Sequence, residues 1–144
     1  MDKLDREIIG ILQIDGRRSF TDIGAAVHLS ANAVADRVRR MVKNGTIRSV
    51  RADVDPAALG KTIEAQIDVK LRPTTSADAF EKAIRHLPQV TTATLLTGSF
   101  DYALRVACTD RTDLAAVTET IRNKAGAQET YSRIILREVQ LGAG

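Results

Sequence analysis

The sequence predicts an α+β protein in which a three-helix N-terminal unit precedes a ferredoxin-like βαββαβ unit. Two observations lead to this prediction. From Leu4 to about Val50 the apolar residues follow the spacing of helices, whereas from Ile63 onward they alternate with polar residues as in strands. Between these regions, Asp55-Pro56 disfavours helix and marks a linker. We therefore expect two domains joined by a short connection.

The first helix is expected to end at Asp15, after about three turns. Its apolar residues share one stripe, at the spacing i, i+4, i+7 and i+8, and are Leu4, Ile8, Ile11 and Leu12. A second, short helix follows, with Ser19 or Thr21 as its N-cap. Its inward residues are expected to be Ile23 and Val27.

The third helix completes a helix-turn-helix. It follows a tight turn at His28-Leu29, and Ser30 offers its N-cap. Asn44-Gly45 is expected to end it, as a left-handed C-cap does. The buried stripe of this helix is expected to consist of Val34, Val38 and Met41. Three short helices with a tight link between the second and third form this motif.

The segment after the third helix is expected to form a small wing or an extended arm, which makes the unit a winged helix-turn-helix. Its apolar residues are expected to face inward, between Arg48 and Arg51, and are Ile47, Val50 and Val54. The predicted organisation is a helix-turn-helix domain at 1–52, a linker at 53–61 and a ferredoxin-like domain at 62–144.

The second domain is expected to contain four strands and two helices. Ile63 to Leu71 alternates as a strand that Pro73 ends. The elements expected after it are a helix at 77–87, a strand at 90–97, a hairpin loop at 98–101, a strand at 102–108, a helix at 112–124 and a strand at 130–139. This βαββαβ order is the split ferredoxin-like arrangement. We expect both helices on one face of the sheet and the other face open.

Positive charge is concentrated in the first domain. Residues 16–51 carry eight basic and two acidic side chains, whereas the net charge of the whole 144-residue chain is only +3. A basic segment of this kind indicates a polyanionic partner. No apolar run approaches the roughly 20 residues that span a bilayer, and the polar opening MDKLDREIIG is unlike a secretory signal. We therefore expect a cytoplasmic, nucleoid-associated protein without a membrane partner.

The third helix has a polar face suited to the major groove of double-stranded DNA. At 100° per residue, the face opposite the buried stripe consists of Asn32, Asp36, Arg39 and Lys43. Asparagine can bond adenine, aspartate can accept from cytosine, and arginine can bond guanine. The further expected DNA contacts, mostly to phosphates, are Arg37, Arg40, Arg17, Arg18, Arg48 and Arg51. Arg37 lies close to the buried stripe, so packing there and pairing with a neighbour is an equal alternative for it.

Neither a catalytic site nor a metal site is indicated. The only cysteine, Cys108, excludes an intramolecular disulfide and a multi-cysteine metal site, and it lies on an inward strand face like a small core hydrophobe. His28 and His86 lie in different halves of the chain, and there is no glycine-rich phosphate loop. We predict that the protein is not an enzyme and holds no cofactor.

Several short motifs follow one another in a characteristic order. In the first half they are Leu4-Asp5, Asp15-Gly16-Arg17, Leu29-Ser30, Arg37-Val38-Arg39-Arg40 and Asn44-Gly45-Thr46-Ile47. In the second half the motif is Thr97-Gly98-Ser99-Phe100-Asp101-Tyr102. Together they resemble the Lrp/AsnC (leucine-responsive, feast/famine) family of transcription regulators over nearly the whole chain. The last motif is similar to the family's Thr-Gly-x-x-Asp loop.

The resemblance implies a regulator of amino-acid or related metabolism. It implies a homodimer built through the open sheet faces, which assembles into octamers or similar rings. It also implies a small effector, expected to be an amino acid, bound between dimers. Carried over by position, the effector region comprises Leu95, Gly98, Ser99, Phe100, Asp101, Tyr102 and, nearby, Ile134. Asp101 has the charge to bind an ammonium group, although Gly98 and Asp101 also suit a plain hairpin.

Three positions depart from the family pattern. His28 stands where the turn usually has glycine, and histidine tolerates positive φ less easily. Ala31 replaces a frequent proline, and Met41-Val42 replaces leucine and glutamate. None of these departures changes the fold prediction.

Two alternative functions share most of these features. A nucleoid-type architectural protein would wrap DNA with little ligand control, and only sequence preference and effector binding distinguish it from a regulator. A few haem-pathway decarboxylases resemble the same two-domain family, and there His86 or the third helix would serve a tetrapyrrole. The basic face of the third helix argues against the decarboxylase.

Overall fold

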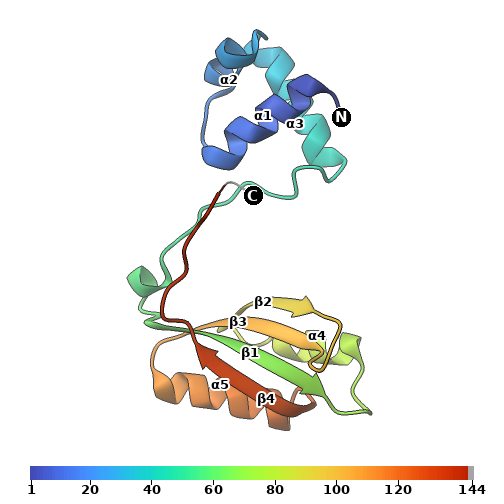
Figure 1. The fold of residues 1–144 in the computed structure, drawn as a ribbon, viewed down its shortest axis with the longest axis vertical. Helices are drawn as coiled ribbons and strands as arrows, with labels where there is room; N and C mark the ends of the chain where they lie inside the picture. The colour runs from blue at the N-terminus through green and yellow to red at the C-terminus, as the bar shows by residue number, and fades with distance from the viewer. Residues whose placement is uncertain (143–144) are drawn as a thin grey trace. The chain divides into compact units, whose positions relative to one another are not determined.

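The computed structural model describes residues 1–142, and the chain forms two compact units (Figure 1). One unit is Met1–Asp53 together with residues 139–142, and the other is Val54–Glu138. Each unit has its own hydrophobic core. Within the described residues, no helix is both long and apolar enough to cross a membrane.

The first unit contains the three expected helices, α1 (Lys3–Ile14), α2 (Phe20–Val27) and α3 (Ala31–Lys43). The N-caps are Asp2, Ser19 and Ser30, and each side chain accepts a hydrogen bond from the backbone N–H three residues later. The expected caps Ser19 and Ser30 are therefore confirmed. The core also contains the expected inward residues, and its buried members are Ile8, Ile23, Val27, Val34, Val38 and Met41.

The turn between α2 and α3 is tight because two residues meet special backbone requirements. His28 adopts the left-handed conformation, with φ 60° and ψ 44°. The N–H of Leu29 donates to the carbonyl of Gly24 at 2.9 Å. A Cβ atom on Gly24 would lie 2.3 Å from the carbonyl oxygen of Leu29, so only glycine fits this approach. The histidine thus forms the turn in the conformation that glycine usually provides.

The segment after α3 is an extended arm, and no strand forms between Lys43 and Ile63 among the described residues. Ile47 packs against the core of the first unit as expected. Val50 and Val54 are 59% and 50% exposed, so their expected inward orientation is wrong. A short 3-10 helix, η1 (Pro56–Leu59), then forms where Asp55 caps the backbone.

The second unit is the expected βαββαβ fold. Its elements are β1 (Ile63–Leu71), α4 (Ala77–Ile84), β2 (Val90–Leu95), β3 (Tyr102–Cys108), α5 (Arg111–Asn123) and β4 (Ala127–Ile134). The strands are antiparallel in the order β2-β3-β1-β4, and both helices cover one face of the sheet (Figure 1). Cys108 is buried in the core between sheet and helices. The opposite face is left open.

The last strand is displaced from its expected range of 130–139. Gly126, with φ 89°, reverses the chain directly after α5, and Ala127 already pairs with Leu71 of β1. β4 then ends at Ile134, and residues 135–140 belong to no strand. The N–H of Ile135 still donates to the carbonyl of Glu64 at 2.8 Å, but β1 begins at Ile63, so the alternating residues farther along have no strand of β1 to pair with.

Candidate nucleic-acid interface and effector region

The outer face of α3 carries the side chains expected to contact DNA. The exposed residues of this face are Asn32, Asp36, Arg39 and Lys43. Val34, Ala35, Val38 and Met41 are buried on the inner face. The helix therefore buries its main apolar stripe within the unit, although Val42 is 51% exposed, and leaves a polar face free.

The only ion pair on this outer face is weak. Among the described residues, Arg39 donates to Asp36 at 2.7 Å, and the two side chains are 72% and 76% exposed. Exposed pairs of this kind contribute at most about 1 kcal/mol because water screens them. Arg39 can consequently exchange this partner for a base or a phosphate, and Asp36 can exchange it for a base amino group, at little cost.

Arg37 faces α1 instead of solvent. Its guanidinium donates to Asp2 at 2.6 Å and to Asp5 at 3.0 Å, and its side chain is only 23% exposed. The hydrogen bond from Arg37 lowers the pKa of Asp2, and the same bond raises the pKa of Arg37. Of its two expected roles, packing and pairing with a neighbour is the one the structure shows.

Arg40 also binds Asp5, at 3.3 Å, although its side chain remains 60% exposed. Asp5 itself is buried, and it is the only buried charged side chain among the described residues. The acidic N-terminus of α1 therefore fixes two arginines of α3. The sequence analysis missed this cluster because its two halves are more than 30 residues apart.

Four of the cations expected to contact DNA lie outside α3, and all four are exposed. Arg17 and Arg18 directly precede the cap of α2, and Arg48 and Arg51 lie on the arm after α3. The guanidinium groups of these four arginines make no hydrogen bond or ion pair within residues 1–142, and Arg17 is engaged only through its backbone N–H, which donates to Asp15. They are accessible to phosphates on either side of the helix-turn-helix.

Asp101 fastens the loop at 96–101 to the neighbouring strand. One carboxylate oxygen accepts from the N–H of Leu71 at 2.8 Å, and its own N–H donates to the carbonyl of Val69 at 2.9 Å. Gly98, with φ 112°, lies in the exposed part of this loop with Ser99. Asp101 thus stabilises the hairpin, as one of its two expected roles requires. Its second carboxylate oxygen has no protein partner within residues 1–142.

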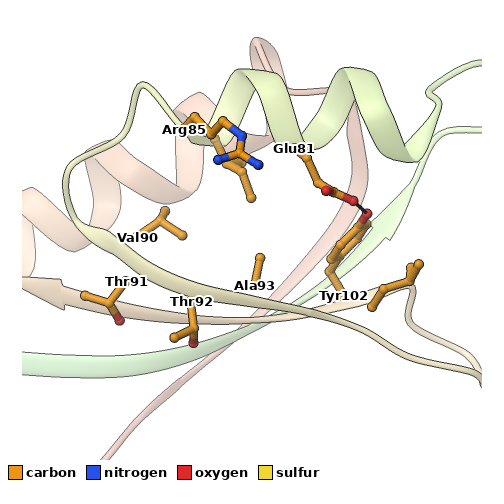
Figure 2. Close-up of a pocket in the computed structure, with 9 residues that line it drawn as sticks. Glu81, Arg85, Val90, Thr91, Thr92, Ala93 and Tyr102 are labelled. Carbon is orange, nitrogen blue, oxygen red and sulfur yellow. Dashed lines mark hydrogen bonds between the residues drawn. The ribbon is translucent and has the colours of Figure 1, made fainter. Parts of the chain in front are cut away.

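Tyr102 points into the helix side of the sheet. It is 1% exposed, its ring lies 4.8 Å from that of Phe80, and its hydroxyl donates to Glu81 (Figure 2). Burial, with a smaller effect of Glu81, raises the pKa of Tyr102 to about 12. Leu95 of β2, which pairs with Tyr102 of β3, is 61% exposed. Tyr102 is therefore a core residue that does not reach the exposed loop.

Ile134 does not lie near the loop within one chain. It pairs with Ala65, whose partner on β3 is Val106. The loop instead adjoins Tyr102. Along β3, Tyr102 lies four residues from Val106, which corresponds to about 13 Å. The expectation that Ile134 is a neighbour of the loop is wrong for a single chain.

Comparison with known proteins places this architecture in a family. The AsnC-type helix-turn-helix domain matches residues 1–42, and the Lrp/AsnC ligand binding domain matches residues 64–142. The HTH-type transcriptional regulator Rv2324 of Mycobacterium tuberculosis is 34% identical over 136 residues, which cover 94% of this chain and 92% of that protein. The leucine-responsive regulatory protein of Salmonella typhimurium is 28% identical, over 97% of this chain and 80% of that protein.

The similarity extends to solved structures. The transcriptional regulator NMB0573 of Neisseria meningitidis, solved in complex with L-Met, is 28% identical and superposes with a TM-score of 0.86. The alignment covers 97% of this chain and 92% of that one. These relatives are transcriptional regulators and not enzymes, which removes support from the decarboxylase alternative. The chain belongs to the Lrp/AsnC family of DNA-binding transcriptional regulators.

Proposed function

We propose that the protein binds specific double-stranded DNA sites as a homodimer and regulates genes of amino-acid or related metabolism. The observation that carries this proposal is the free outer face of α3, with Asn32, Asp36, Arg39 and Lys43 exposed opposite a complete core. A dimer presents two such helices to half-sites about one helical turn apart. We place its action in the cytoplasm, at the nucleoid.

The predicted DNA contacts divide into two groups under this proposal. Asn32, Asp36 and Arg39 read base edges in the major groove, since the N-terminal residues of a recognition helix usually do so. The phosphate contacts come from Arg40, Lys43, Arg17, Arg18, Arg48 and Arg51. Arg37 leaves the set of direct DNA contacts, because its guanidinium already binds two carboxylates.

The effector is proposed to be an amino acid bound near the loop at 96–101, between dimers of a larger ring. The match to a ligand binding domain supports this, as does the L-Met complex of the Neisseria regulator. Exposed Gly98 and Ser99 offer backbone groups, and the second oxygen of Asp101 offers an acceptor for an ammonium group. Ile134 contributes only if a second chain brings it to this loop. Ligand binding then shifts DNA affinity by favouring one assembly over another.

Fluorescence anisotropy tests the proposal with a duplex from upstream of the protein's own gene and a scrambled duplex of equal length. Both are titrated at two salt concentrations, with and without an amino-acid mixture. We expect preference for the native sequence, steep salt dependence and a shift of affinity with the mixture. Equal, salt-sensitive binding to both duplexes would instead identify an architectural protein.

Asp101→Asn tests the loop as the effector region. Asparagine retains an oxygen that accepts from Leu71, so we expect the fold and basal DNA affinity to be unchanged. The lost charge should abolish the effector-dependent shift in anisotropy. Asp101→Ala is a harsher variant, because it also leaves the Leu71 N–H without its acceptor. A normal response of Asp101→Asn to the mixture would show that the loop is not the site.

A further inference from the structure

Arg40 differs from the other cations that we assign to DNA phosphates. Its Nη2 donates to both carboxylate oxygens of Asp5, at 3.4 Å and 3.3 Å. Within residues 1–142, no side-chain partner is present for the other cations of this group, which are Lys43, Arg17, Arg18, Arg48 and Arg51. In the described part of the chain, Arg40 is thus the one phosphate-binding candidate whose side chain is already held by another residue.

The contact with Asp5 occupies only one edge of the Arg40 guanidinium. An arginine side chain has five N–H donors. Nε and Nη1 of Arg40 make no hydrogen bond within residues 1–142, and the side chain is 60% exposed. Arg40 follows Asp36 by four residues and precedes Lys43 by three, so it lies beside the outer face of α3. Its free N–H groups can therefore bind a phosphate while Nη2 remains on Asp5.

Asp5 is a well-fixed support for Arg40. Its side chain is only 6% exposed, and its backbone N–H donates at 2.8 Å to Asp2, the N-cap of α1. Its Oδ1 also accepts from Arg37 at 3.0 Å. The carboxylate is thus anchored from α1 and from α3, so the packing of these two helices determines how Arg40 is oriented.

This arrangement lowers the entropic cost of contacting DNA. Immobilising a long, rotamer-rich side chain on binding weakens affinity by about two- to tenfold. Arg40 loses this freedom when the protein folds, and not when it meets DNA. A carboxylate beside DNA would by itself repel phosphates, but two arginines contact Asp5 and balance its charge.

We propose that Asp5 is a positioning residue of the DNA interface. It holds Arg40 by one edge of the guanidinium, so that the other edge binds a backbone phosphate. This inference rests on the proposed function, since it requires α3 to lie on DNA. It adds an acidic residue that strengthens DNA binding, which net charge alone would not predict. Because phosphates carry no sequence information, Asp5 raises the affinity for every duplex by the same factor.

Anisotropy titrations of Asp5→Asn and Asp2→Asn, with the native upstream duplex and the scrambled duplex, test this role. Asp2→Asn is the matched control, because it removes a negative charge from the same end of α1 and contacts Arg37 but not Arg40. Asparagine also remains a good N-cap. We expect Asp5→Asn to weaken binding to both duplexes by about two- to tenfold, and Asp2→Asn not to weaken it. Equal affinities of the two variants would overturn the positioning role.

A double substitution separates positioning from a general structural effect. In an Arg40→Gln background the positioned side chain is absent, so Asp5→Asn should no longer weaken binding. A purely structural contribution of Asp5 would persist in that background and would overturn the proposal. Failure of the unaltered protein to bind either duplex would overturn the proposed function as well, whereas the other results bear on Asp5 alone.

Arg40→Lys provides a second test that leaves Asp5 in place. Lysine retains the charge but lacks the planar fork with which arginine bonds a carboxylate and a phosphate at once. We expect binding to both duplexes to weaken about as much as in Asp5→Asn, while the dependence of affinity on salt keeps its slope. Unchanged affinity of Arg40→Lys would contradict the role of the Asp5 contact.

Discussion

Asp5 shows how a single buried carboxylate orients the recognition helix. It accepts hydrogen bonds from Arg37 at 3.0 Å and from Arg40 at 3.3 Å, so the N-terminus of α1 is tied to the middle of α3. The sequence marks Asp5 only as part of a short motif, because periodicity reports the face of one helix and not the partners on another. The sequence therefore left DNA contact and internal pairing as equal alternatives for Arg37, and only the structure distinguishes them.

Substituting Asp5 by asparagine should destabilise the protein. Asparagine is nearly isosteric but lacks the charge that both arginines require, and hydrogen bonds to charged groups contribute about 1.5–3 kcal/mol. We expect a loss of about this size in the free energy of unfolding, measured with urea. Glu7→Gln is the matched control, since its exposed pair with Lys3, at 3.9 Å, contributes little. Equal stability of the two variants would show that the Asp5 cluster is not structural.

Arg39 is the cation we assign to a base. Arg39→Ala should weaken binding to the native upstream duplex by about 1–3 kcal/mol and relax the preference over the scrambled duplex. Arg111→Ala is the control, because this exposed arginine begins α5 in the second unit. Unchanged affinity of Arg39→Ala, measured by anisotropy at fixed salt, would contradict the placement of α3 on DNA.

At the scale of elements, the turn before α3 depends on Gly24 more than on the residue at the turn itself. A methyl group at position 24 would collide with the Leu29 carbonyl, whose oxygen is backbone and cannot move away alone. His28 accepts the left-handed conformation that the family pattern usually assigns to glycine. Its φ of 60° shows that the turn keeps this conformation with histidine in place of glycine.

Gly24→Ala should therefore destabilise the first unit by about 1–3 kcal/mol, as overpacking does. Gly10→Ala provides a control of opposite sign. It lies in α1 with nothing within 4 Å of an added Cβ, so alanine should stabilise the helix by about 0.5–1 kcal/mol. Thermal or urea unfolding of both variants measures these effects. A neutral Gly24→Ala would mean that α2 and the turn do not pack as closely as the structure has them.

The sequence predicted elements well where the determining signal is local. Ser19 and Ser30 cap α2 and α3 because an N-cap hydroxyl bonds a backbone N–H only three residues away. The range of β4 was wrong by several residues, because the length of a strand depends on its register with the partner strand. β4 pairs with β1 between Ala65 and Leu71, and this register fixes its length.

At the scale of the molecule, the open sheet face is polar and already paired within one chain. Arg105 binds Glu64 at 3.1 Å and Glu138 at 3.3 Å, and Arg133 binds Asp68 at 2.9 Å.

We propose a homodimer formed through this face. We also propose a domain division at 1–52, 53–61 and 62–144. The two compact units observed divide between Asp53 and Val54.

The two candidate sites differed in how far the sequence predicted them. The exposed face of α3 follows from one helical period, so its residues were placed correctly. The effector region was taken from the family resemblance as a set of positions. In the fold these residues lie in different parts of the sheet. Tyr102 is in the core, Ile134 is at the other end of the sheet, and Asp101 supports the loop. Contacts made across a sheet, or between chains, leave no periodic signal.

Methylation interference on the preferred duplex tests most directly whether α3 reads the major groove. Dimethyl sulfate methylates guanine N7, which lies in the major groove, and adenine N3, which lies in the minor groove. The account predicts that methylated guanines block binding in two clusters about 10–10.5 base pairs apart. Interference only at adenine N3, or at no base in either groove, would contradict it.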